Sequence, residues 1–299
     1  MKQKLLSNGL LLLIAMIWGF AFVAQVGGSE SVGSLTFTGV RFAMGIIALL
    51  PVTLLLEKGR SEREERRRTV KGSLVAGIVL FCASILQQYG IALTASAGVA
   101  GFITGLYTVF IPIVSFLLFR KKAGGFVWLG ALCALFGLFL LCYRVGEGFH
   151  FGLGELLLLI GSFFWTAHVL VVDRFGKSVR SLHFSVGQFS VCAVLGLAGM
   201  FLFEKPTVAS LLDAGIPLLY CGVLSVGVAY TLQVVAQKKA DPAVAAIVLS
   251  TESLFSAVGG ALFGVDTIST LGYFGCGLML AGIVLSQLGD LGKKDKTIE

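Results

Sequence analysis

Residues 34–42 read Ser-Leu-Thr-Phe-Thr-Gly-Val-Arg-Phe, and residues 181–189 read Ser-Leu-His-Phe-Ser-Val-Gly-Gln-Phe. The serine, the leucine and both phenylalanines recur in register, 147 positions later in the chain. The same separation pairs Trp18 with Trp165, each of which follows a leucine-rich run. This internal similarity predicts that the chain contains two copies of one structural unit.

The composition is far more apolar than that of a soluble protein. Hydrophobic residues make up 57% of the chain, charged residues only 13%, and the mean hydropathy is +0.94. Soluble domains are about 45–50% apolar and about 25% charged, and a soluble fold could not hide this excess. We therefore predict an integral membrane protein. The six cysteines lie in apolar runs without a Cys-x-x-Cys pair, which argues against disulfides or a metal site.

Apolar runs long enough to cross a bilayer recur along the whole chain. A transmembrane helix needs about 20 such residues, and the absence of period-2 alternation favours an all-α fold over a barrel. Short loops separate the runs, and no soluble domain is inserted between them. The ten predicted spans are residues 7–26, 35–56, 72–93, 98–119, 124–143, 152–172, 181–203, 214–235, 242–264 and 268–288.

The charged residues orient these spans. If ten spans alternate in direction, the basic residues gather on one side, and the other side holds only Arg144 and Lys205. By the positive-inside rule, both termini are then cytoplasmic. The net charge of +7 is thus a topology signal and does not indicate a nucleic-acid partner. We interpret the Arg-rich segment 60–71 as a solvated loop helix, with contact to anionic lipid as the alternative.

Five spans per copy is an odd number, so the second copy must cross the membrane in the opposite direction. The predicted fold is therefore ten transmembrane helices in a 5+5 inverted repeat. The first copy covers residues 1–143, the second covers residues 152–290, and residues 291–299 form a cytoplasmic tail. Two inverted copies can exchange conformations that open to opposite sides, which is the physical basis of alternating access.

Short motifs in both copies carry a resemblance to a known family. They are Trp18-Gly19, Arg41-Phe42, Gln87-Gln88-Tyr89-Gly90, Thr94 to Gly98, Gly101 to Tyr107 with Pro112, Gln233 to Gln237, Asp241-Pro242 and Thr251 to Phe255. With them the whole chain resembles the drug/metabolite transporter superfamily, and within it the EamA-type ten-helix exporters. The resemblance implies a bundle around a central cavity, and transport of amino acids, other metabolites or drugs. One departure is that Ser253 follows Glu252, where relatives commonly carry proline.

Three ionisable residues inside the predicted spans are the leading functional candidates, because a charge within a membrane is costly unless it is paired or hydrated. Glu252, mid-way along span nine, could couple transport to protons or bind a substrate amine; the alternative is a protonated glutamate bonded to a neighbouring helix. Arg41 could bind a substrate carboxylate or pair with Glu252; the alternative is a guanidinium that reaches the outer interface. His168 is a second candidate for proton coupling, or a packing residue.

Neutral polar and aromatic side chains form stripes along several of the predicted spans. Such stripes face either a substrate cavity or another helix, and bonding between helices is the alternative to substrate contact. Gly101-x-x-x-Gly105 and Gly260-x-x-x-Gly264 are interpreted as sites of close helix crossing. The neutral candidates for substrate contact are Trp18, Gln25, Gln88, Tyr107, Trp165, Tyr230 and Gln233.

The sequence as a whole favours a secondary transporter that exports a small metabolite, such as an amino acid, across a bacterial-type inner membrane. No phosphate-binding loop, metal motif, dinucleotide fingerprint or hydrolase motif is present, so we expect no cofactor, no metal and no enzymatic activity. The expected partners are a small-molecule substrate, membrane lipid and the proton, in a monomer or a homodimer. The alternatives are an intramembrane enzyme acting on lipids, and a membrane sensor or structural protein.

Overall fold

The computed structural model describes residues 2–59, 62–120, 124–144, 148–176, 179–230, 232–233, 248–266 and 268–294. Its helices are α1 (Lys2–Ser29), α2 (Ser34–Leu56), α3 (Arg63–Thr94), α4 (Ala97–Gly105), α5 (Tyr107–Phe119), α6 (Gly125–Leu141), α7 (Leu153–Gly176), α8 (Ser181–Phe203), α9 (Val208–Asp213), α10 (Gly215–Leu219), the π-helix η1 (Tyr220–Ala229), α13 (Glu252–Leu262) and α14 (Thr270–Lys294). Two short strands, β1 (Tyr143–Arg144) and β2 (Gly148–Phe149), pair antiparallel between α6 and α7.

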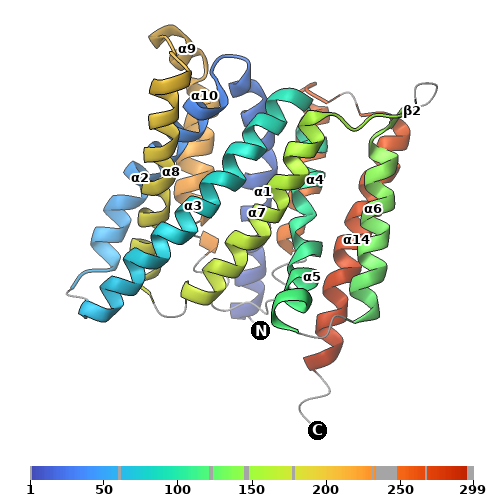
Figure 1. The fold of residues 1–299 in the computed structure, drawn as a ribbon, viewed down its shortest axis with the longest axis horizontal. Coiled ribbons are helices and arrows are strands. Elements are labelled where there is room, and N and C mark those ends of the chain that lie inside the picture. Colours follow the sequence, from blue (N-terminus) through green and yellow to red (C-terminus); the bar gives the residue numbers. More distant parts are fainter. Residues whose placement is uncertain are drawn as a thin grey trace.

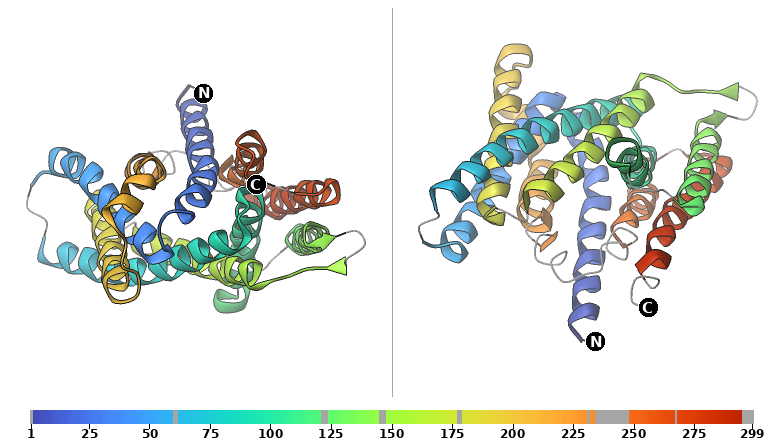
Figure 2. Two further views of the ribbon diagram at one scale, coloured as in Figure 1. Left: turned by 90° about the horizontal axis from the view of Figure 1, so that it is seen from above. Right: turned by 60° about the horizontal axis from the view of Figure 1, so that its bottom comes forward.

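The helices form one bundle whose long elements run between two ends (Figure 1). α1 begins and α14 ends at the lower end of the bundle as drawn in Figure 1, and we keep the terms lower end and upper end below. α2 crosses α8 at one side of the bundle, while α6 and α14 lie side by side at the opposite edge in both figures (Figure 2). α1 packs on both η1 and α13.

The observed helices follow the predicted spans closely. Within the described residues, six segments are long and apolar enough to cross a membrane, and four shorter apolar helices cover Gly125–Leu141, Gly215–Ala229, Val248–Leu262 and Thr270–Ser286. α8 has the predicted bounds, whereas α3 begins nine residues before the predicted residue 72. The early start is physically favourable, because Glu64 and Glu65 lie in the first turn, where carboxylates interact well with the helix dipole.

Three predicted spans are not continuous α-helices in the described part of the chain, and one of them, at 242–264, has a turn at Thr251. The span predicted at 98–119 is divided at Leu106 into α4 and α5. The span predicted at 214–235 changes from α10 to the π-helix η1. π-Helical turns are rare and are common at functional sites. The strands β1 and β2 are a further feature that the predicted all-α fold did not include, and they occupy only the link between α6 and α7.

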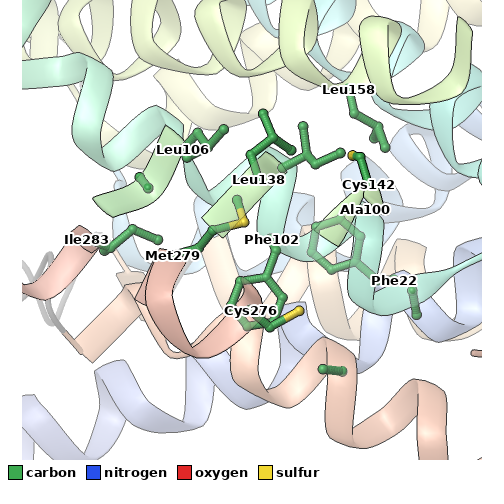
Figure 3. Packing of buried hydrophobic residues seen from close by; sticks show 14 of the residues in the cluster. Phe22, Ala100, Phe102, Leu106, Leu138, Cys142, Leu158, Cys276, Met279 and Ile283 are labelled. Carbon is green, nitrogen blue, oxygen red and sulfur yellow. The ribbon is translucent and has the colours of Figure 1, made fainter. Parts of the chain in front are cut away.

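A large apolar cluster holds together the helices on the α6–α14 side of the bundle. Phe102 of α4, Leu138 of α6 and Met279 of α14 are buried there, and Phe22 of α1 and Leu158 of α7 complete its borders (Figure 3). Side chains from at least five helices therefore share one close-packed interior. Relative to exposure in water, burial of each large apolar side chain contributes about 1.5–3 kcal/mol. Relative to exposure to lipid this contribution is absent, and close packing supplies the attraction between the helices.

α6 and α14 cross through two glycine pairs that repeat each other. A Cβ atom added to Gly130 would lie 2.4 Å from the carbonyl oxygen of Gly282, and one added to Gly275 would lie 2.5 Å from the carbonyl oxygen of Gly137. Gly130 and Gly275 are 145 positions apart, as are Gly137 and Gly282. The contact is therefore made twice by matched positions, by which we mean positions about 145 to 147 residues apart.

The packing of α3 on α8 is also repeated by the packing of η1 on α2. A Cβ atom on Gly77 would lie 2.9 Å from the carbonyl oxygen of Gln188. A Cβ atom on Gly222 would lie 3.0 Å from the carbonyl oxygen of Arg41. Gly77 matches Gly222, and Gln188 matches Arg41. The two interfaces therefore use the same pair of positions, with the glycine from the first copy in one interface and from the second copy in the other.

Two carboxylates cap the helices α8 and α2 in the same way, at opposite ends of the bundle. Glu57 follows the last residue of α2 and accepts hydrogen bonds from the first turn of α8. Glu204 follows the last residue of α8, 147 positions later, and accepts hydrogen bonds from the first turn of α2. The oxygen–nitrogen distances are 3.0 Å to Leu182 and 3.1 Å to His183 for Glu57, and 3.0 Å to Leu35 and 2.7 Å to Thr36 for Glu204.

A third carboxylate fixes α13 against α4. Gly264 ends the turn after α13 with a φ of +67°, a left-handed conformation that glycine adopts without strain. The chain then places Asp266 at the first turn of α4, where it accepts hydrogen bonds from the Ser96 hydroxyl (2.8 Å) and the Gly98 amide (2.9 Å). Gly101 also approaches Ser256 closely enough to exclude any side chain, so this predicted glycine motif is a close crossing.

Candidate functional site

Arg41 is the centre of a buried polar group formed by α1, α2 and α3. The Arg41 side chain is only 6% exposed, and its Nη1 atom donates to Gln25 Oε1 at 2.6 Å. The backbone oxygen of Gln25 accepts a hydrogen bond from Gln88 Nε2 at 3.3 Å. Gln88 Nε2 also donates to Ser29 Oγ at 2.8 Å. The structure thus brings together three of the predicted site residues: Arg41, Gln25 and Gln88.

Some hydrogen-bonding capacity in this group is unused. Arg41 Nε and Gln88 Oε1 are buried and have no hydrogen-bond partner within the described part of the chain. The Arg41 guanidinium lies over the rings of Phe42 and Phe37, at 5.3 Å and 5.8 Å from the ring centres. Buried polar atoms without partners are uncommon in proteins, so a donor and an acceptor in one buried group are suited to bind a polar solute.

A second polar group occupies the matched place between α7 and α8. His168 is 5% exposed, and its Nε2 atom lies 2.8 Å from Gln188 Oε1, so the neutral ring that bonds this oxygen carries its proton on Nε2. Trp165 packs edge-on against His168, with ring centres 5.9 Å apart. The indole Nε1 of Trp165 has no partner among the described residues. Gln188 matches Arg41 in the other copy, and its contact with His168 was not predicted.

Aromatic rings lie between the two polar groups. Phe42 and Phe189 occupy matched positions and contact each other, with ring centres 5.7 Å apart. Tyr230 packs on Phe189 at 5.3 Å and on Trp18 at 5.1 Å. Trp18 donates its indole N–H to the backbone oxygen of Ser225, in the π-helix η1, at 3.3 Å. The predicted residues Trp18 and Tyr230 therefore meet, in a position that depends on the π-helix directly before Tyr230.

Glu252 begins α13 and is 5% exposed. It lies near enough to Tyr107 and Tyr230 to act electrostatically on both hydroxyl groups. Arg41 and Glu252 are both described, and no ion pair joins them, since the guanidinium bonds to Gln25 instead. The predicted alternative of an Arg41–Glu252 pair is therefore not found in this conformation.

The helix that carries Glu252 is interrupted directly before it. Residues 248–250 are helical, Thr251 forms a turn, and α13 starts at the next residue. Thr251 donates to the backbone oxygen of Val248 from both its hydroxyl, at 2.6 Å, and its amide, at 3.2 Å, so the backbone tightens here without a proline. Glu252 consequently lies at a helix N-terminus, where the dipole favours a negative charge.

Two other predicted residues are less closely involved. Tyr107 begins α5 directly after the division at Leu106, and its backbone oxygen accepts a hydrogen bond from Thr166 Oγ1 at 3.3 Å. Gln233 is half-buried, and the structure gives no hydrogen bond for its side chain among the described residues. Gln237 of the same predicted stripe lies outside the described residues. The interruptions at Leu106 and Thr251 and the π-helix were not predicted, although each lies beside a candidate residue.

Known proteins resemble this chain over nearly its full length. A family model described as the EamA-like transporter family matches residues 5–143 and 152–288. An uncharacterized transporter of Archaeoglobus fulgidus is 26% identical over 290 residues, which cover 96% of this chain and 87% of that protein. The uncharacterized inner membrane transporter YedA of Escherichia coli K12 is 24% identical over 297 residues, which cover 96% of this chain and 92% of that protein.

A solved crystal structure shares the fold. It is 19% identical in sequence, covers 94% of this chain and 96% of its own, and superposes with a TM-score of 0.65. The helices of this chain are apolar enough to make it a multi-pass membrane protein. Since the family model covers both long segments of the sequence, the chain belongs to the EamA-like transporter family of the drug/metabolite transporter superfamily.

Proposed function

We propose that this protein is a secondary transporter that exports a small zwitterionic solute, such as an amino acid, by alternating access. The observation that carries the proposal is Arg41, a charged side chain held inside an apolar bundle with its Nε atom unpaired among the described residues. A charge in such a place is costly and typically serves a substrate or ion pathway. Guanidinium groups bind carboxylates through two parallel hydrogen bonds.

The proposal includes a 5+5 inverted repeat made of residues 1–143 and 152–290, with both termini and the tail 291–299 in the cytoplasm. The matched glycine crossings and the two carboxylate caps at opposite ends of the bundle support this arrangement. The distribution of basic residues supports the orientation. An inner-membrane location is proposed because the Escherichia coli relative carries that description.

The chemistry of the solute follows from the groups around Arg41. The guanidinium would bind a carboxylate, the rings of Trp18 and Tyr230 would contact an apolar or cationic portion, and Glu252 would bind an amine or a proton. His168 remains a second candidate for proton coupling. Proton antiport and uncoupled exchange are both consistent with these residues, and the experiment below separates them.

The test uses the purified chain in sealed proteoliposomes loaded with labelled neutral, acidic or basic amino acids. We expect efflux of at least one zwitterionic solute, accelerated by an imposed pH gradient. Glu252→Gln should abolish the acceleration while solute exchange continues, because the glutamine cannot carry the proton. Glu30→Gln, at an exposed position, serves as the control for loss of one carboxylate.

Two results would contradict the proposal. Absence of flux for every solute in correctly folded protein would remove the transport function. Unchanged dependence on the pH gradient in Glu252→Gln would remove Glu252 from proton coupling and leave the binding of a substrate amine as its role.

A further inference from the structure

A groove of about 1020 Å³ lies on the surface of the bundle between α3 and α8. It is located toward the lower end, where both helices begin (Figure 1). Arg66 and Leu74 line its α3 wall, while Arg180, Val194 and Leu195 line the wall formed by α8 and the residue before it. The groove is separate from the buried polar groups around Arg41 and His168.

The walls of this groove change from cationic to apolar along its length. On α3, spacings of three and four residues place one continuous stripe on a single helix face. The whole stripe lines a second hollow of about 410 Å³, and its members Arg66, Val70 and Leu74 line the groove as well. Its members, in order from the lower end, are Arg63, Arg66, Arg67, Val70, Lys71 and Leu74.

The α8 wall has the same polarity. Arg180 and His183 line its lower end, Gly187 and Ser190 follow, and Val191, Val194 and Leu195 line the upper part. The rise from His183 to Leu195 is about 18 Å at the helical pitch. One leaflet of the hydrocarbon core is about 15 Å thick, so the whole α8 wall, from its polar lower end to its apolar upper end, spans about the depth of one leaflet.

The apolar part of the groove faces outward from the bundle. Val194 is 65% exposed, Val70 is 54% exposed and Leu74 is 50% exposed. In a membrane-spanning bundle such side chains contact lipid tails. The groove thus offers a tail-binding surface that ends in a cluster of cations.

The cations of the groove are only partly neutralised by the protein. Glu57 contacts His183 Nδ1 at 2.7 Å, and its carboxylate lies 3.8 Å from Arg180 Nε. This single carboxylate serves both groups and two backbone amides. Arg66 has no carboxylate partner among the described residues. An anion between Arg66 and Arg180 would therefore add charge-assisted hydrogen bonds to both guanidinium groups.

The matched end of the molecule lacks this chemistry. The positions that match Arg180 and His183 are Gly33 and Thr36, neither of which carries a charge. The shared packing of the helices consequently does not require an arginine or a histidine at this place. Arg180 follows the one-sided distribution of basic residues described above, and it gives the lower end of the groove a charge that can attract an anion.

We propose that the groove between α3 and α8 binds an anionic phospholipid, with its phosphate between Arg66 and Arg180 and its acyl chains along the apolar walls. Basic pockets between transmembrane helices are suited to anionic headgroups. The inference rests on the membrane location of the bundle and is independent of the proposed transport.

The test measures lipid binding by native mass spectrometry on the full chain in neutral detergent. We expect phosphatidylglycerol to bind about tenfold more tightly than phosphatidylcholine, because two guanidinium groups contact its phosphate and the lipid carries net charge. The double variant Arg66→Gln/Arg180→Gln should lose this preference. Arg68→Gln should keep it, because Arg68 lies on the same helix but pairs with Glu64 at 3.1 Å and does not line the groove.

Arg66→Gln alone guards against misfolding of the double variant, since the side chain of the exposed Arg66 makes no hydrogen bond with the described residues, whereas Arg180 donates to the Gly59 oxygen at 3.0 Å. We expect it to weaken phosphatidylglycerol binding severalfold with unchanged melting temperature. Equal lipid selectivity in wild type and Arg66→Gln would overturn the proposal, as would equal loss in Arg68→Gln. Saturation by glycerol 3-phosphate or inorganic phosphate at the lipid's concentration would also overturn it, because the tails would then contribute nothing.

Discussion

The two ends of the α2–α8 pair are built alike and differ in one respect. At each end a glutamate that follows one helix accepts hydrogen bonds from the first turn of the other, and the two glutamates are 147 positions apart. At the lower end the imidazole of His183 also contacts Glu57, at 2.7 Å. At the upper end the matched residue is Thr36, and no such contact is made with Glu204 by the described residues.

This difference separates the features that hold the fold together in both copies from those that differ between the copies. The matched places share the glutamate helix caps, the glycine crossings and the Phe42–Phe189 ring contact. Other ionisable side chains are not shared, since Arg41 is matched by Gln188 and His183 by Thr36. Backbone geometry holds the fold, whereas a charge in one copy alone can serve a ligand without disturbing it.

Substitutions at the glycine crossing of α6 and α14 should lower the free energy of unfolding more than any other change proposed below. Gly130→Ala should lower the free energy of unfolding by about 3 kcal/mol or more, because its Cβ atom would meet backbone atoms of Gly282 and Ser286 that cannot move independently of the helix. Gly275→Ala should cost a similar amount, since it meets the matched backbone. Thermal unfolding in detergent measures both.

Gly277→Ala is the matched control for these variants. Gly277 lies on α14, two residues from Gly275, and a Cβ atom there would meet nothing within 4 Å. Alanine should therefore stabilise the helix by about 0.5–1 kcal/mol through propensity. Equal melting temperatures for Gly130→Ala and Gly277→Ala would show that the close crossing is not needed. A large difference between Gly130→Ala and Gly275→Ala would break the comparison of matched positions.

Arg41→Gln gives position 41 the residue found at the matched position, Gln188, and therefore tests what the charge contributes. Loss of a charge-assisted hydrogen bond should slow transport of carboxylate-bearing solutes by about 10- to 100-fold. Solutes without a carboxylate should be affected much less. Flux assays in proteoliposomes measure the ratio, with Arg68→Gln as a control for removal of a surface guanidinium. Equal loss for both classes of solute would assign Arg41 a structural role.

The positions of the helices were largely predictable from the sequence. α2 and α8 begin and end where predicted within one residue, because each apolar run is closed by a charged residue, Glu57 or Glu204. The interruption at Leu106 and the π-helix η1 were not predictable in this way. A run that is apolar on all sides carries no signal that separates an α-helical turn from a π-helical one, since either helix can be built from it.

The candidate site was predictable as a set of residues but not as a set of contacts. Arg41, Gln25 and Gln88 were identified because polar groups in apolar spans are costly. That Arg41 bonds to Gln25 and not to Glu252 depends on which helices are neighbours, which is a tertiary property. The Glu57 and Glu204 caps were not predicted, although their separation of 147 positions was a signal that could have paired them.

Removal of either carboxylate cap should have a smaller effect on the free energy of unfolding, and the two values test whether the caps are equivalent. Glu204→Gln should reduce the free energy of unfolding by about 1 kcal/mol, through loss of a charged cap at the N-terminus of α2. Glu57→Gln should cost at least as much, because the contact with His183 is lost as well. Chemical unfolding in detergent gives both values. A larger cost for Glu204→Gln would mean that His183 adds nothing to the lower cap.

The smallest expected effect is the pH dependence of the lower cap. Burial alone would raise the pKa of Glu57, but hydrogen bonds from His183 and Leu182 outweigh it, so the net pKa lies below the ordinary value of 4.5. A carboxylate with a lowered folded-state pKa adds stability above its unfolded value, and this stability is lost as the pH falls through the folded-state pKa. The loss should therefore occur on the acid side of 4.5.

His183→Thr, which gives the lower end the residue found at the upper end, should reduce this pH dependence by removing a hydrogen bond to the carboxylate. Melting temperatures of wild type, His183→Thr and Glu57→Gln between about pH 6 and about pH 3 test the effect. The wild type should lose the most stability on acidification and Glu57→Gln the least. The same slope in wild type and His183→Thr would show that the backbone amides alone lower the pKa of Glu57, and the two ends would then be electrostatically equivalent despite the histidine.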